Sequence, residues 1–162
     1  MKRRSEIFAL KQALATCHAH KEGLSDALAD LEQRGLNATD LEKLSKQDRR
    51  LLDQFAYRYT RLQDDMGTRL MPAILGALSE DVGPMATLDR LNRLEQLEWL
   101  PSAEEWAELR RIRNEFVHDY PGTVTERFER FQLATTCARR LLEILSILDR
   151  KTQERFAQIA NE

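Results

Sequence analysis

The sequence has few of the residues that interrupt helices. Its 162 residues include only six glycines and four prolines, too few for an all-β sandwich, which needs a turn signal about every 8–12 residues. There is no uninterrupted apolar run of about 18 residues, so no transmembrane helix is predicted. No apolar segment follows the basic start at residues 2–4, so no signal peptide is predicted and we expect a cytoplasmic protein.

Cysteines are also few, and neither sign of charge is in large excess. The two cysteines, Cys17 and Cys137, fall at apolar positions of helical patterns, so we expect core residues rather than redox or metal-binding groups. The net charge of −2, from 25 basic and 27 acidic side chains, excludes a uniformly basic coat for nucleic acid but allows a local basic patch. Nineteen of the basic residues are arginines, whose planar fork suits phosphate and carboxylate.

What the sequence does have is helical periodicity along its whole length. Apolar residues at spacings of three and four recur over residues 7–31, 52–78, 88–97, 106–117 and 131–159. With 42% apolar and 32% charged residues the chain can form an ordinary core. We therefore predict one all-α domain over residues 1–162, an up-and-down four-helix bundle with extra short helices.

Local signals predict where these helices begin and end. Gly35 is expected to end the first helix, and Pro72 to kink or end a later one near Met71. Helix starts are predicted from capping residues at 39–42, at Ser45, near Thr87, at 102–105 and at 123–126.

The helix predicted between Pro101 and Pro121 breaks its own apolar pattern at Arg113. An arginine at a core-facing position is unfavourable unless it is paired or faces a solvated cleft. Local violations of this kind tend to occur at functional sites. Arg110 and Arg111 lie within the same turn, so three arginines gather there.

The end of that helix carries groups suited to a phosphodiester. Asn114 and His118 are four residues apart and share a face of the helix. Arg113 and His118 are about 140° apart around the helix axis, so these two side chains can flank one cleft. Arginine can neutralise phosphate oxygens, and histidine can accept a proton from a ribose 2′-hydroxyl or give one to a leaving oxygen. No cluster of metal ligands accompanies them, so any cleavage is expected to be metal-independent.

Several other residues have two open interpretations. Asp64 either pairs with a motif arginine across the bundle or is a surface acid. His18 and His20 are about 200° apart on a helix, cannot share a metal, and are expected to be structural. Trp106 is expected in the core or an interface. Four later arginines either extend an RNA path or form a solvated face: Arg127, Arg130, Arg139 and Arg140.

The motif resembles that of the HEPN superfamily, an Arg and a polar residue followed three residues later by His, here Arg113-Asn114-x3-His118. The extension to Tyr120 resembles the HepT-type toxins of HEPN/MNT toxin–antitoxin pairs. The stretches 62–64, 88–95 and 105–114 are similar to the same branch, so the resemblance covers about residues 50–145.

The resemblance implies a four-helix bundle that forms a homodimer and cleaves RNA without metal or cofactor. His118 would be the acid/base group, Arg113 would bind the scissile phosphate and Asn114 would orient the site, with Asp64 and Arg110 in support. Tyr120 would be adenylylated by a partner MNT-type nucleotidyltransferase, the antitoxin. AMP on Tyr120 would place a bulky anion beside the Arg113/His118 cleft and repel RNA.

Two further hypotheses stay open. The chain could be a non-catalytic HEPN subunit that presents a nucleotide to a neighbouring nucleotidyltransferase, with Arg113 on its phosphate. It could also be a helical oligomerisation protein without a site. The titratable His118 favours the ribonuclease, because a binding subunit has no need of it.

Overall fold

The structure is a computed structural model that describes residues 2–118 and 121–156. In it the chain folds into helices joined by short connections. Within those two ranges no strand is present, and the all-α prediction is confirmed. In chain order the elements are α1 (Lys2–Arg34), α2 (Ala38–Glu42), α3 (Lys46–Asp65), the π-helix η1 (Met66–Leu70), α4 (Met71–Ala77), α5 (Thr87–Gln96), α6 (Ala103–His118) and α7 (Val124–Arg155).

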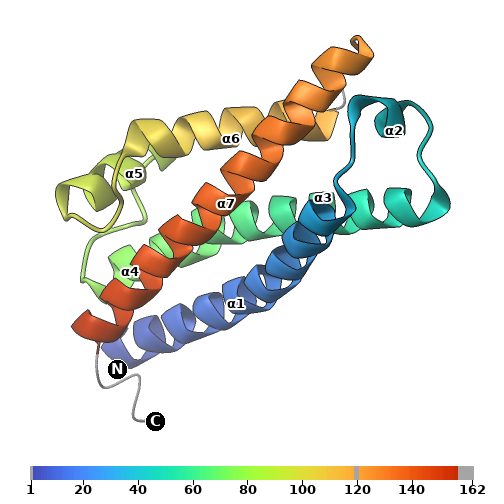
Figure 1. The fold of residues 1–162 in the computed structure, drawn as a ribbon. Helices are drawn as coiled ribbons and strands as arrows, with labels where there is room; N and C mark the ends of the chain where they lie inside the picture. Colours follow the sequence, from blue (N-terminus) through green and yellow to red (C-terminus); the bar gives the residue numbers. More distant parts are fainter. Residues whose placement is uncertain (1, 119–120, 157–162) are drawn as a thin grey trace.

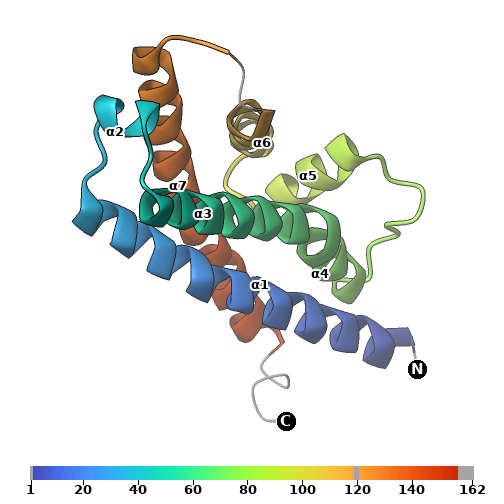
Figure 2. The same ribbon diagram turned by 90° about the vertical axis from the view of Figure 1, so that its right-hand side faces the viewer.

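The long helical segments pack around a shared interior. In Figure 1, α7 runs diagonally across the molecule, with α2 and α6 near one of its ends and α1 near the other. Figure 2 shows α3 lying between α1 on one side and α6 on the other. The short α5 lies against α4 and α6. Because α3 has neighbours on two opposite sides, successive residues of this helix face different partners.

The buried apolar side chains form one cluster, to which all the long helices contribute. Near the end of α6 the cluster is aromatic: the Phe55 and Tyr59 rings of α3 lie 5.7 and 6.1 Å from the Phe116 ring, centroid to centroid. Phe131 of α7 lies 6.3 Å from Phe55. Aromatic pairs in such arrangements add about 0.5–1.5 kcal/mol each beyond area burial. This aromatic cluster fixes the end of α6 against α3 and α7.

Most of the predicted helix ends are confirmed. Gly35 follows α1 with φ of +60°, a conformation that glycine adopts without the Cβ penalty, and its N–H bonds the Leu31 carbonyl at 3.0 Å. Ser45 Oγ caps α3 and Thr123 Oγ1 caps α7, each accepting a backbone N–H of the first turn. Ser102 Oγ accepts the Glu105 N–H at the start of α6.

The prediction of a capping box over residues 39–42 is wrong about where the box lies. The box instead joins Asn37 and Asp40: the Asp40 N–H bonds Asn37 Oδ1 at 2.8 Å, and the Asn37 N–H bonds Asp40 Oδ2 at 2.9 Å. Asparagine is among the best N-cap residues, so the helix starts two positions earlier than a Thr39 cap would allow.

Pro72 does not end its helix. The helical path continues from Lys46 to Ala77, and the backbone widens into the π-helix η1 just before the proline, where the Met71 N–H bonds the Met66 carbonyl. The missing N–H of Pro72 falls at the start of α4, where it is best tolerated. The prediction of a kink fits the change of direction from α3 to α4 in Figure 2.

The described helices include none with the length and apolar character needed to cross a membrane.

Candidate functional site

The helix α6 places Arg113 at the edge of the core. Trp106, Leu109 and Ile112 are buried along its inner face, and Arg113 follows directly with only 13% of its side chain exposed. The core stripe therefore turns at Ile112 rather than continuing to position 113. The sequence correctly identifies Arg113 as a cation held largely out of water.

The Arg113 guanidinium is held by two neighbours. One terminal nitrogen donates to Asp64 Oδ1 of α3, and the other donates to Asn114 Oδ1 at 2.6 Å. The structure thus decides between the two interpretations of Asp64: it pairs with the motif arginine across the helices, although 48% of its side chain stays exposed. Two of the five guanidinium N–H groups are used in this way, so others remain for a ligand.

The environment of Arg113 is apolar on its inner side. Within the described residues its buried Nε has no hydrogen-bond partner, and neither has the nearby buried Tyr59 hydroxyl. Burial raises the pKa of Tyr59 above its usual value, and the charge of Arg113 opposes that rise. Tyr59 therefore stays neutral, and the positive charge of Arg113 is weakly screened toward the protein.

The three arginines of α6 point to different surroundings. Arg111 forms ion pairs with Glu108 and Glu115 on the outer face, which hold its pKa above the usual range. Arg110 is exposed and lines a small cavity with Trp106. Only Arg113 contacts Asp64 and Asn114. Of the three arginines that are close in sequence, Arg111 is therefore paired at the surface, and Arg110 and Arg113 are candidates for ligand binding.

His118 is the last residue of α6 and is exposed. Asn114, which shares its face in an ideal helix, turns its amide oxygen to Arg113. Tyr120, the predicted site of adenylylation, lies outside the described residues, as does Asp119. The structure brings Arg113, Asn114 and Asp64 into contact and leaves His118 five residues further along the same helix.

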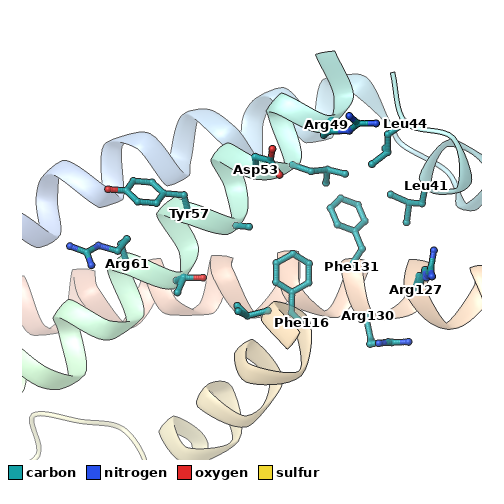
Figure 3. Close-up of a pocket in the computed structure, with 14 residues that line it drawn as sticks. Leu41, Leu44, Arg49, Asp53, Tyr57, Arg61, Phe116, Arg127, Arg130 and Phe131 are labelled. Atoms are coloured by element: carbon teal, nitrogen blue, oxygen red, sulfur yellow. The ribbon is translucent and has the colours of Figure 1, made fainter. Parts of the chain in front are cut away.

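A cavity of about 640 Å³ opens beside this end of α6, between α2, α3 and the start of α7. Figure 3 shows Phe116 and Phe131 on one side of it and Tyr57 and Arg61 on α3. Phe116 and Val117, the two residues before His118, belong to the cavity wall. Among the described residues, its charged lining consists of four arginines and one acid: Arg49, Arg61, Arg127, Arg130 and Asp53.

Two of the four later arginines singled out in the sequence line this cavity, Arg127 and Arg130. Arg140 does not, because it forms a forked pair with Glu105 and a further bond to Glu143. Arg139 is exposed elsewhere on α7. Of the four arginines that could extend an RNA path, only the two in the first turns of α7, Arg127 and Arg130, therefore stay candidates.

The sequence analysis missed the α3 side of the cavity. Arg49, Asp53, Tyr57 and Arg61 are each four residues apart, so they share one face of the helix. That spacing is visible in the sequence and predicts a polar, aromatic stripe. What it does not predict is that this stripe faces α7, since the neighbour depends on the tertiary arrangement.

Other residues have the structural roles expected of them. Cys17 and Cys137 are buried and free, and burial raises the pKa of the Cys17 thiol to about 12. Trp106 is buried. His18 pairs with Asp149 of α7 at 3.1 Å. In the described ranges, no group of three or more His, Cys, Asp or Glu residues is arranged to hold a metal ion.

His20 is more buried than its sequence position suggests. Only 8% of the residue is exposed, and its Nε2 lies 3.3 Å from Asp65 Oδ2. Its Nδ1 lies 3.2 Å from an Arg58 nitrogen. Burial lowers the pKa of His20, with Asp65 opposing and Arg58 and Arg61 reinforcing the shift. His20 belongs to the contact between α1 and α3, away from α6.

No family model, no curated protein and no solved structure matches the chain.

Proposed function

We propose that this chain is a metal-independent endoribonuclease of the HepT type, a toxin that acts on RNA in the cytoplasm as a homodimer with a HEPN-like four-helix bundle. The observation that carries the proposal is the Arg113 guanidinium, held by Asp64 and Asn114 near the end of α6 and followed by the exposed His118. A fixed cation beside a titratable imidazole is the minimum needed for cleavage of RNA by its own 2′-hydroxyl.

In the proposed reaction His118 accepts the proton of the ribose 2′-hydroxyl as its oxygen attacks phosphorus. The bond from phosphorus to the 5′ oxygen then breaks, and that oxygen takes a proton from an imidazolium. Arg113 donates to the nonbridging oxygens, whose negative charge grows in the transition state. The products are a 2′,3′-cyclic phosphate and a 5′-hydroxyl. The imidazolium that protonates the leaving 5′ oxygen comes from the second protomer of the homodimer.

The cavity beside His118 supports RNA as the substrate. Aromatic faces and arginines together are typical of single-stranded nucleic-acid sites, where bases stack and cations follow the backbone. Phe116, Tyr57 and Phe131 provide such faces, and among the described residues of the lining there are four arginines and one aspartate. A volume of about 640 Å³ lies within the range of pockets that take small ligands and is wide enough for a nucleotide.

Expression of the chain alone tests the toxin directly. Wild-type protein is expected to arrest growth, and Arg113→Ala and His118→Ala to abolish the arrest while the far-UV circular dichroism stays unchanged. Arg111→Ala is the matched control, because Arg111 is on the same helix but paired on its outer face. Arrest by the His118→Ala protein would contradict the assigned role.

Regulation by the partner has its own test. Coexpression with an MNT-type nucleotidyltransferase is expected to silence the wild type and add the mass of AMP to it. Tyr120→Phe is expected to stay toxic and unmodified. A silenced Tyr120→Phe protein would remove Tyr120 as the acceptor.

The same experiments separate the alternative, a non-catalytic HEPN subunit for a nucleotidyltransferase. The cavity also fits that function, because its size and its arginines suit a nucleotide. Such a subunit would bind a nucleotide without arresting growth, and binding would survive His118→Ala.

A further inference from the structure

A second, smaller cavity lies where the end of α3, η1, the start of α4, the start of α5 and the first turns of α6 meet. Its volume is about 160 Å³. Its polar lining consists of Gln63, Asp64, Thr68, Thr87, Arg90 and Arg110. Trp106 forms part of its apolar wall, and a Cβ at Gly67 would lie 3.4 Å from the Trp106 ring, which shows how closely the η1 backbone approaches α6.

The two cations of this cavity are Arg90 and Arg110. Neither Arg90 nor Arg110 has an ion pair or hydrogen bond to any described residue, and Arg90 Nε is buried. Their neighbours in sequence are paired: Arg93 bonds Glu80 at 2.8 Å, and Arg111 bonds two glutamates. The one acid of the lining, Asp64, is already neutralised by Arg113. The cavity is therefore positive, and its own side chains do not balance that charge.

Gln63 adds a buried polar group without a partner. Only 4% of the residue is exposed, and its Nε2 has no hydrogen bond in the described structure. An unsatisfied buried donor costs about 1–3 kcal/mol. The side chain lines the cavity, and a half-turn of its terminal torsion exchanges the amide nitrogen and oxygen. A ligand with acceptor oxygens would satisfy this donor.

The size of the cavity limits what that ligand can be. The cavity volume of about 160 Å³ is the volume that about five water molecules occupy in the liquid, at ~30 Å³ each. This is enough for a tetrahedral oxyanion and too little for a nucleoside, for which the larger cavity beside His118 has room. Two arginines and an amide donor are typical of phosphate recognition.

We infer that this cavity binds a phosphate group, through Arg90, Arg110 and Gln63. Arg110 precedes Arg113 by three residues, about 4.5 Å along the helix axis. Under the proposed function, on which this part of the inference rests, the group is a backbone phosphate of the RNA next to the one that is cleaved. The other source of the same chemistry is free phosphate or the phosphate end of a nucleotide.

Titration with inorganic phosphate, at constant ionic strength set with chloride, tests the site without any RNA. By calorimetry the wild type and Arg111→Gln are expected to bind phosphate equally. Arg110→Gln and Arg90→Gln are expected to weaken binding at least tenfold, with unchanged circular dichroism. Arg93→Gln, on the same helix as Arg90, is expected to bind as the wild type does. No binding by the wild type, or equal loss in Arg110→Gln and Arg111→Gln, would overturn the inference.

A second measurement separates the two sources and needs no cleavage. Fluorescence anisotropy of a labelled single-stranded oligoribonucleotide is measured in the His118→Ala background. If the RNA backbone occupies the site, adding Arg110→Gln weakens RNA binding and lowers the salt slope by about one. If free phosphate is the occupant, Arg110→Gln weakens phosphate binding at least tenfold and leaves RNA binding unchanged. Because phosphate binding is measured on its own, the site can be confirmed even where RNA cleavage fails.

Discussion

Asp64 and Asp65 are adjacent in sequence and have opposite surroundings. Asp65 is buried, with 8% of its side chain exposed, and lies against His20 of α1. Asp64 is 48% exposed and pairs with Arg113 of α6. At about 100° per residue, neighbours on α3 turn to different partners, and α3 lies between α1 and α6. The same residue type therefore makes a structural contact on one side and a contact open to ligands on the other.

The difference shows which of the two contacts can take part in chemistry. A contact that water and substrate cannot reach contributes only to folding, whereas a half-exposed ion pair can exchange its partners. The predictions below are arranged to separate these two roles, and they run from the largest expected effect on stability to the smallest.

The His20→Ala substitution is expected to lower the free energy of unfolding by about 2–3 kcal/mol at pH 7, since it removes a buried ring that lies against Asp65 and opens a cavity. Urea denaturation measures this. His18→Ala is the control two residues away, because His18 is exposed and its pair with Asp149 is expected to contribute no more than about 0.5 kcal/mol. Equal losses in the two variants would contradict the assignment.

Stability is also expected to fall as the pH is lowered from about 7 to 5. The pKa of His20 is lower in the folded chain than its ordinary value of about 6.5, so the unfolded chain binds the proton more tightly. Stability is therefore complete above the unfolded pKa and is lost as the pH falls toward the folded one. Among the described residues, Asp65 and Arg58 contact His20, the Tyr57 ring lies 6.1 Å from its ring, and Arg61 adds a further positive charge.

The His20→Asn variant separates this histidine from the carboxylates. Salt bridges lower the pKa values of Asp48, Glu80 and Glu108 below their usual range, and their contribution is lost only below about pH 4.5. In the His20→Asn variant the free energy of unfolding is thus expected to depend less on pH between 5 and 7 and to keep its dependence at lower pH. An unchanged slope in that window would assign it to another group.

The Asp64→Asn substitution is expected to change stability by less than about 1 kcal/mol, because the pair is half exposed. Its effect on RNA cleavage is expected to be larger, about tenfold, since Asp64 holds the guanidinium of Arg113. Asp64→Glu is expected to recover part of the rate. A large loss of stability with unchanged cleavage would reverse the roles of the two aspartates.

The smallest effect concerns the thiols. Burial raises the pKa of both Cys17 and Cys137, so neither is a thiolate at pH 8. A colorimetric thiol reagent is expected to react with the native protein only as slowly as it unfolds, and at once in urea. Rapid reaction of the native protein would show that a thiol is accessible.

The sequence was sufficient to predict the helices and many of their ends, because periodicity and capping residues such as Ser45 and Thr123 are local signals. The π-helix before Pro72 was not predicted, since the proline shows only where an α-helix is disfavoured. The shift of a cap to Asn37 shows a similar limit: several residues nearby can cap, and the choice depends on the path of the chain.

For the candidate site, the sequence located Arg113 through the break in its apolar stripe and gave Asp64 as one possible partner. It did not predict the burial of His20, because a polar residue gives no apolar signal at its position. The cavities were out of reach for a different reason. They bring α3, α5, α6 and α7 together, and no local pattern encodes which helix faces which.

The most direct test of the account is cleavage of a labelled single-stranded RNA by the purified protein in the presence of a chelator. The wild type and Arg111→Ala are expected to cleave alike, leaving 2′,3′-cyclic phosphate ends. Arg113→Ala is expected to be about 10²–10³-fold slower, the effect of removing one donor to a developing oxyanion, and His118→Ala inactive. Cleavage by Arg113→Ala and His118→Ala at the wild-type rate would contradict the central claim.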